Sequence, residues 1–141
     1  ILIKRIVSCI FILRRQETLL DKISEKINSF IAKMDYETAS YGMIKNPPNA
    51  WNYIVFSRDR LQRSDKSPND FNRKYRIVLV HEDCVPEGDE LALMKAMKEI
   101  PRLNLAKEDI IYDYAVNPKT KNVVEMAVLT FAETIKGYEV K

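Results

Sequence analysis

Glycine, histidine and cysteine are scarce in this chain of 141 residues, and each scarcity excludes a class of chemistry. With only three glycines, the chain cannot assemble a phosphate-binding loop or a dinucleotide fingerprint. His81 is the single histidine, and the two cysteines, Cys9 and Cys84, lie far apart without the spacing of metal ligands. Such cysteine usage is typical of free thiols in a reducing compartment.

The chain also lacks an apolar run long enough to span a bilayer, which takes about 20 residues. Its most apolar stretch, ILIKRIVSCIFIL, resembles a signal peptide but is followed by Arg14 and Arg15 in place of a small-residue cleavage site. We therefore expect residues 1–15 to form an apolar N-terminal extension. Packing on protein and binding at a membrane surface are the two roles that the pattern leaves open.

The remaining residues, 16–141, have the composition of one soluble domain with a modest core, because the chain is 46% hydrophobic and 30% charged. Apolar residues spaced by three and four from Leu20 to Met34 predict an amphipathic helix that ends near Asp35. Residues 36–50 contain Gly, Asn and a Pro-Pro pair, which predict a linker.

Aromatic and β-branched runs then predict two pairs of strands with a helix between them. The expected strands are 51–58, 73–82, 109–116 and 122–134, the helix is 89–100, and a long polar loop covers 59–72. We predict an α+β domain of order αββαββ, in which two hairpins form a four-stranded antiparallel sheet with both helices on one face. The other face would carry apolar residues, either because another chain covers it or because this core assignment is incomplete.

The search for catalytic and metal sites is negative. His81 precedes two carboxylates, Glu82 and Asp83, but no nucleophile is placed beside it, and neighbouring strand residues point to opposite faces. Cys84 and His81 lack the two further ligands of a zinc site. The acids of residues 82–90 lack the spacing of a calcium loop and suit the start of a helix. We expect no catalytic residue, metal or cofactor.

Charge is unevenly distributed along the chain. Residues 58–76 hold seven bases against three acids, and residues 82–90 hold five acids and no base. The basic stretch also contains or adjoins Phe56, Phe71 and Tyr75, so it could bind single-stranded nucleic acid by charge and stacking, or it could be a solvated loop. If the two charged regions lie on opposite flanks, subunits could instead associate head to tail and close a ring.

A family resemblance favours the ring. The pattern from Leu19 to Val140 resembles the small tail-terminator and tail-completion, or head–tail joining, proteins of long-tailed bacteriophages and prophages. The segments that carry it are the helix LLDKISEKINSFI, the strands WNYIVFSR and RKYRIVLVHED, the helix VPEGDELALMKAMKEI and the hairpin DIIYDYAVNPKTKNVVEMAVLTFAETIKGYEV. The resemblance lies in the order and size of the elements and in their general residue pattern, without an invariant motif. Residues 1–15 depart from it.

The resemblance implies a structural protein rather than an enzyme. Such proteins form a hexameric ring that ends tail-tube polymerisation and docks the head connector or neck protein, with DNA only as passing cargo and no membrane partner. The implied location is the tail–neck junction of a virion assembled in the bacterial cytoplasm. A small nucleic-acid-binding module using residues 58–76 is the alternative. The residues that charge marks as subunit-contact or channel-facing are Arg58, Arg60, Arg63, Lys66, Arg73, Lys74, Glu87, Asp89 and Glu90.

Overall fold

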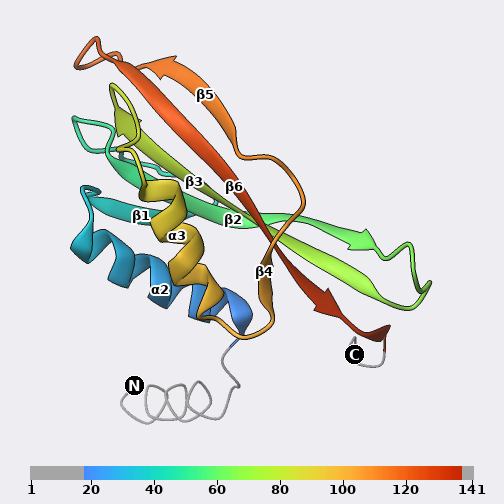
Figure 1. Cartoon of the computed structure of the whole chain (residues 1–141). Helices are drawn as coiled ribbons and strands as arrows, with labels where there is room; N and C mark the ends of the chain where they lie inside the picture. The colour runs from blue at the N-terminus through green and yellow to red at the C-terminus, as the bar shows by residue number, and fades with distance from the viewer. Residues whose placement is uncertain (1–17, 138–141) are drawn as a thin grey trace, which may run out of the picture.

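A computed structural model describes residues 18–137, so the predicted N-terminal extension lies outside the described residues. Both predicted helices are confirmed, as α2 (Leu19–Lys33) and α3 (Asp89–Lys98) (Figure 1). Helix α2 begins with a capping box, in which the Thr18 hydroxyl accepts a hydrogen bond from the Asp21 amide and the Asp21 carboxylate accepts one from the Thr18 amide. Neither helix is long and apolar enough to cross a membrane.

Six strands form one mixed sheet. They are β1 (Thr38–Tyr41), β2 (Tyr53–Arg63), β3 (Phe71–Glu82), β4 (Leu103–Leu105), β5 (Ile111–Val116) and β6 (Val123–Ile135). The spatial order is β1-β2-β3-β6-β4, and β5 pairs with the same edge of β6 as β4, nearer the start of β6. All pairings are antiparallel except that of β1 with β2.

The predicted four-stranded antiparallel sheet is therefore not confirmed. The expected linker contains β1, whose parallel partner β2 begins 12 residues after β1 ends, so nothing local in the sequence signals the pairing. The short strand β4 follows α3 and covers β6 at residues 131–133. Strands β2 and β3 also extend through most of the predicted loop 59–72, which leaves a tip of residues 64–70.

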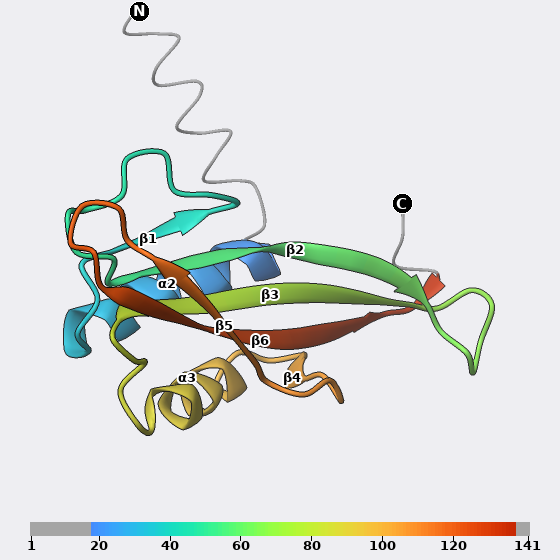
Figure 2. The same ribbon diagram turned by 90° about the horizontal axis from the view of Figure 1, so that it is seen from above.

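The main core lies between the two helices and one face of the sheet. Strand residues at alternating positions, such as Ile54, Ile77 and Leu129, pack there against Ile27 of α2 and Met97 of α3, and all five are fully buried. This side of the sheet is called the helix face below. Figure 2 shows how far the sheet extends beyond the helices toward the β2–β3 tip.

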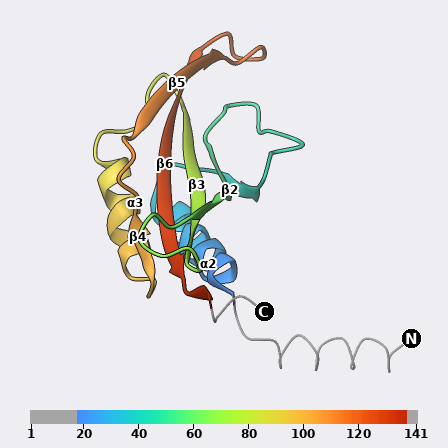
Figure 3. The same ribbon diagram turned by 90° about the vertical axis from the view of Figure 1, so that its right-hand side faces the viewer.

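A second, smaller core lies on the opposite face. Val80 and Val124 are buried there, with Ile44 and Trp51 from the connection between β1 and β2 packed against them. Figure 3 shows that this connection lies on the other side of the sheet from α3. Part of the apolar surface expected on this face is thus covered by the chain's own residues 42–51.

Candidate functional site

The predicted basic residues lie on an extension of the sheet that is formed by β2, β3 and β6. We call its β2–β3 part, residues 58–76, the basic arm. Strand β3 is central in this extension, because Phe71 pairs with Arg63 of β2 on one side and with Ile135 of β6 on the other. The tip is closed by a 2.9 Å hydrogen bond from the Ser64 amide to the Asp70 carbonyl. The arm is therefore strand from the body of the sheet to its tip, and the polar loop predicted over 59–72 is confined to residues 64–70.

The strand register divides the arm's bases between the two faces. Arg58, Arg63 and Arg73 share the helix face with the exposed side chain of Leu61. Arg60, Lys74 and Arg76 lie on the opposite face. A bulge between Arg58 and Arg60 allows Arg58 and Arg60, two positions apart, to face opposite sides.

Some of these bases already have partners within the chain. Lys74 forms an ion pair with Glu108, and its hydrogen bond lowers the pKa of that carboxyl. Arg60 contacts Asp59 at 3.0 Å. In the described part of the chain, no ion pair joins Arg58, Arg63 or Lys66 to another residue. These three side chains are exposed and available to a partner.

The aromatic residues of the arm are not placed for stacking on bases. Phe56 and Tyr75 are buried in the main core, with 7% and 2% exposure, and Phe71 is half-buried. Binding of single-stranded nucleic acid by stacking needs exposed aromatic faces. The arrangement therefore supports a charge contact more than a stacking platform.

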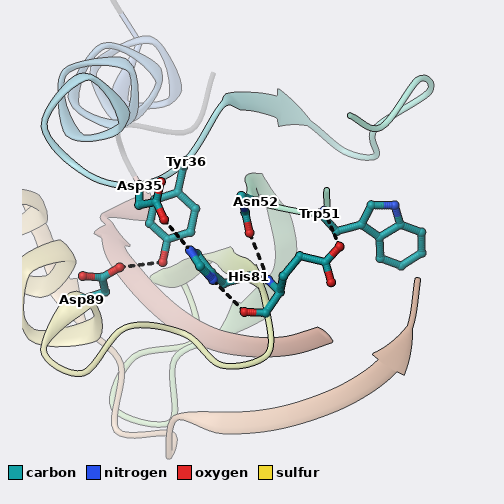
Figure 4. Close-up of polar contacts among 7 residues, drawn as sticks. Asp35, Tyr36, Trp51, Asn52, His81 and Asp89 are labelled. Atoms are coloured by element: carbon teal, nitrogen blue, oxygen red, sulfur yellow. Dashed lines mark hydrogen bonds and ion pairs between the residues drawn. The ribbon is translucent and has the colours of Figure 1, made fainter. Parts of the chain in front are cut away.

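The predicted acidic residues lie in the acidic turn, residues 82–90, but they are not equivalent. Glu87 is exposed and Glu90 is half-buried. Asp89 is buried and accepts a 2.7 Å hydrogen bond from the hydroxyl of Tyr36, as Figure 4 shows. Burial raises the pKa of Tyr36, and Asp89 raises it further. Asp89 is thus engaged inside the fold and Glu90 contacts the Tyr112 hydroxyl, while Glu87 is exposed to a partner.

The arm and the acidic turn lie at opposite ends of one strand. Strand β3 enters from the arm at Phe71 and leaves into the acidic turn after Glu82, a span of 12 residues. At about 3.4 Å per residue, the tip of the basic arm and the acidic turn are roughly 40 Å apart. Figure 2 shows the tip and the start of α3 at the two ends of the sheet. The tip of the basic arm and the acidic turn thus lie at two ends of the sheet, an arrangement that the sequence left as a condition for head-to-tail association.

His81 faces away from the carboxylates that adjoin it in sequence. Its Nε2 lies 3.0 Å from Oδ2 of Asp35, and its Nδ1 lies 2.9 Å from the Glu82 carbonyl oxygen (Figure 4). The ring meets Tyr36 edge to face. Asp35 is 46 residues away, so the sequence did not reveal this pair. Among the described residues, no group of three His, Cys, Asp or Glu side chains could hold a metal ion.

A buried polar cluster at the end of β3 was also missed from the sequence. Oε1 of Glu82 accepts hydrogen bonds from the Trp51 amide, the Asn117 side chain and the Thr120 hydroxyl. Burial alone would raise the pKa of Glu82, but these hydrogen bonds outweigh burial and lower it. The cluster joins the β1–β2 connection, β3 and the β5–β6 turn, which fixes the end of the sheet beside the acidic turn.

In comparisons of the sequence with known proteins, no protein-family model and no curated protein matched the chain.

Proposed function

We propose that this protein is a structural virion component that forms a ring at the head-proximal end of a phage tail tube. The ring ends tube polymerisation and joins the tail to the head connector. The protein is not an enzyme in this proposal, and it acts at the tail–neck junction after assembly in the bacterial cytoplasm. Its partners are other copies of itself, the tail-tube protein and a connector or neck protein.

The observation that carries the proposal is the separation of charge along one sheet. One end of the sheet carries the exposed bases Arg58, Arg63 and Lys66, which form no ion pair within residues 18–137, and the other end carries Glu87 and Glu90. A surface that is basic at one end and acidic at the other can place its basic end against the acidic end of a neighbour, and in the proposed ring it does so head to tail. Contacts of that kind form a ring when the rotation closes.

The architecture supports the same proposal. The α+β fold with two helices and an extended sheet has the helix–hairpin–helix–hairpin order on which the family resemblance rests. The added strands β1 and β4 are short and lie at the sheet edges, so they leave that order intact.

The test is the mass of the full-length protein, measured by light scattering and native mass spectrometry, alone and with the cognate tail-tube protein. We expect a closed oligomer, either free or on tube ends, and tubes of limited length. A protein that remains monomeric at high concentration and does not bind the tube protein would refute the proposal.

Charge reversal tests the contact itself. Replacing Arg58, Arg63 and Lys66 by Glu should weaken association, and replacing Glu87 and Glu90 by Lys in the same chain should restore part of it. Lys74 and Asp89 are left unchanged, because their partners Glu108 and Tyr36 lie within the fold. A loss that reflects unfolding would also appear in the far-UV circular dichroism spectrum and would not be restored.

A further inference from the structure

The edge of the sheet formed by β5 is apolar and unpaired. Within residues 18–137, β5 pairs with β6 alone, so its outer backbone groups have no strand beside them. Five of its six side chains are exposed. Ile111, Tyr112, Tyr114 and Val116 are each between 44% and 63% exposed, although all four are large and apolar or aromatic. A long, apolar, open edge is normally covered in a native protein.

Carboxylates surround this edge. Burial raises the pKa of the Tyr112 hydroxyl, and Glu90 of the acidic turn raises it further. The Tyr114 hydroxyl donates a 2.9 Å hydrogen bond to Glu125. Asp113 is exposed between them. Strand β5 and the acidic turn therefore form one continuous acidic and aromatic surface.

The opposite edge of the sheet offers a matching strand. Strand β1 covers β2 along Tyr53–Phe56, and no described strand covers the same side of β2 from residue 57 to 63. Residues 58–63 of this free stretch belong to the basic arm and equal β5 in length. They include Arg58, Arg60 and Arg63, together with Leu61, which is 55% exposed.

We infer that β5 of one copy pairs with residues 58–63 of β2 in the next copy, which continues the sheet from subunit to subunit. The inference rests on the proposed ring and names the strands that make its contact. Charge complementarity favours residues 58–63 of β2 as the partner of β5, because the basic arm is positively charged and the surface around β5 is negatively charged. The other edge strands, β1 with sequence TASY and β4 with sequence LNL, carry no charge to match it.

Strand direction is compatible with this pairing. Strands β2, β3, β6 and β5 alternate in direction across the sheet, so β5 runs opposite to β2. A neighbour in the same orientation thus presents its β2 antiparallel to β5. The antiparallel order of the sheet therefore continues from one subunit to the next while both subunits keep the same orientation.

The faces also match. On the helix face, Tyr112 and Tyr114 would lie beside Leu61 and Arg63, a combination of apolar and cation–π contacts. In that register, Asp113 would lie opposite Gln62 on the other face, with Arg60 as its diagonal neighbour. Tyrosine and arginine are the side chains that most often dominate protein–protein contacts.

The pairing staggers neighbouring subunits along the strands. Along the strand direction, β5 lies at the level of the end of β3, whereas residues 58–63 of β2 lie at the level of the beginning of β3. The two levels differ by about eight residues, or roughly 27 Å. In a closed ring such an offset requires strands inclined to the ring axis, as in a barrel. Because of this offset, the neighbouring subunit does not overlap β1, which covers the other part of the β2 edge, or β4, which covers the other part of the β6 edge.

Cysteine cross-linking tests the pairing. In full-length protein with Cys9→Ser and Cys84→Ser, one preparation carries Asp113→Cys and a second carries Arg60→Cys or Gln62→Cys, two positions that share a face and sample adjacent registers. After mixing, assembly with tube protein and oxidation, we expect disulfide-linked dimers that contain one chain of each kind. Each preparation alone should give none.

The outcomes separate this inference from the proposed function. A closed assembly that links Asp113→Cys to itself or to Ser40→Cys of β1 would overturn the β5–β2 pairing and leave the ring intact. A closed assembly in which neither partner cross-links would also overturn it. A protein that forms no assembly, measured by mass in the same samples, would overturn both.

A charge exchange provides the second test. Asp113→Arg should weaken self-association by roughly tenfold, and Arg60→Glu in the same chain should recover most of that loss. Glu25→Arg, an equal charge change on the exposed side of α2, is the matched control and should leave association unchanged. Equal effects of Asp113→Arg and Glu25→Arg would contradict the inference, because net charge alone would then explain both.

Discussion

Nδ2 of Asn117 lies 2.8 Å from Oε1 of Glu82, and this hydrogen bond joins the β5–β6 turn to the end of β3. The same amide nitrogen donates to the Asn49 carbonyl at 2.7 Å, and Oδ1 accepts from the Lys119 amide at 3.0 Å. Asn117 is fully buried. One side chain therefore satisfies three polar groups from separate parts of the chain, at the end of the sheet that carries the acidic turn.

Asn117→Ala should lower the free energy of unfolding by about 2–3 kcal/mol, because it removes three hydrogen bonds, one of them to the buried Glu82 carboxylate, from a fully buried position. Asn122→Ala is the matched control, since Asn122 is exposed in the same turn, and it should change stability by less than about 0.5 kcal/mol. Urea denaturation followed by circular dichroism measures both. Equal stability of the two variants would show that the buried cluster contributes nothing.

Glu82 should make stability depend on pH. Its pKa is lowered in the folded state, so the unfolded chain binds protons more readily. The stabilisation is present above the ordinary pKa of a glutamate, about 4.3, and is lost as the pH falls through the lower folded value. Glu82→Gln removes this contribution and should flatten the curve.

The measurement is urea denaturation of wild type and Glu82→Gln from pH 7 down to pH 3. The difference between the two curves isolates Glu82 from Glu99 and Glu108, whose pKa values are also lowered. We expect the wild type to lose more stability than the variant at the acid end. Parallel curves would contradict the assignment.

The Tyr36–Asp89 hydrogen bond connects the segment before β1 to the start of α3. Tyr36→Phe removes the donor and leaves the buried Asp89 carboxylate without it, so the free energy of unfolding should fall by about 1–3 kcal/mol. Tyr41→Phe makes the same chemical change at a half-exposed ring and serves as the control. A loss from Tyr41→Phe as large as that from Tyr36→Phe would mean that ring packing, not this bond, carries the effect.

The sequence was sufficient for both helices because their buried residues recur at helical spacing within one segment. Ile23, Ile27 and Phe30 of α2 form such a stripe, and the capping residue Thr18 precedes it. The α+β class followed from the same local patterns. The mixed sheet did not follow, because the pairing of β1 with β2 depends on residues far from TASY.

The basic arm shows why strand ends were misplaced. Residues 58–63 of β2 are all exposed. The sequence therefore has no alternation of apolar and polar residues there that would predict a strand. They are extended because β3 pairs with them along the whole stretch and β6 supports β3 in turn. The candidate site was identified as charge in the sequence, whereas the engagement of Asp89 and Lys74 inside the fold needed tertiary contacts.

Substitution of Leu61 can distinguish an effect on folding from an effect on assembly. Its side chain is 55% exposed on the basic arm, so Leu61→Ser should change the free energy of unfolding by less than about 0.5 kcal/mol. At the proposed β5–β2 contact, however, Leu61 would be covered by Tyr112 and Tyr114, and loss of that burial should weaken association by about tenfold.

Met43→Ser is the control for this prediction, because Met43 is 72% exposed beyond the end of β1 and outside the proposed contact. Sedimentation velocity over a range of concentrations measures association, and urea denaturation measures stability in the same preparations. If both substitutions weaken association equally, the contact includes the β1 edge and the pairing with β2 is wrong. If Leu61→Ser alone weakens it while both variants remain as stable as wild type, Leu61 acts between subunits rather than within one.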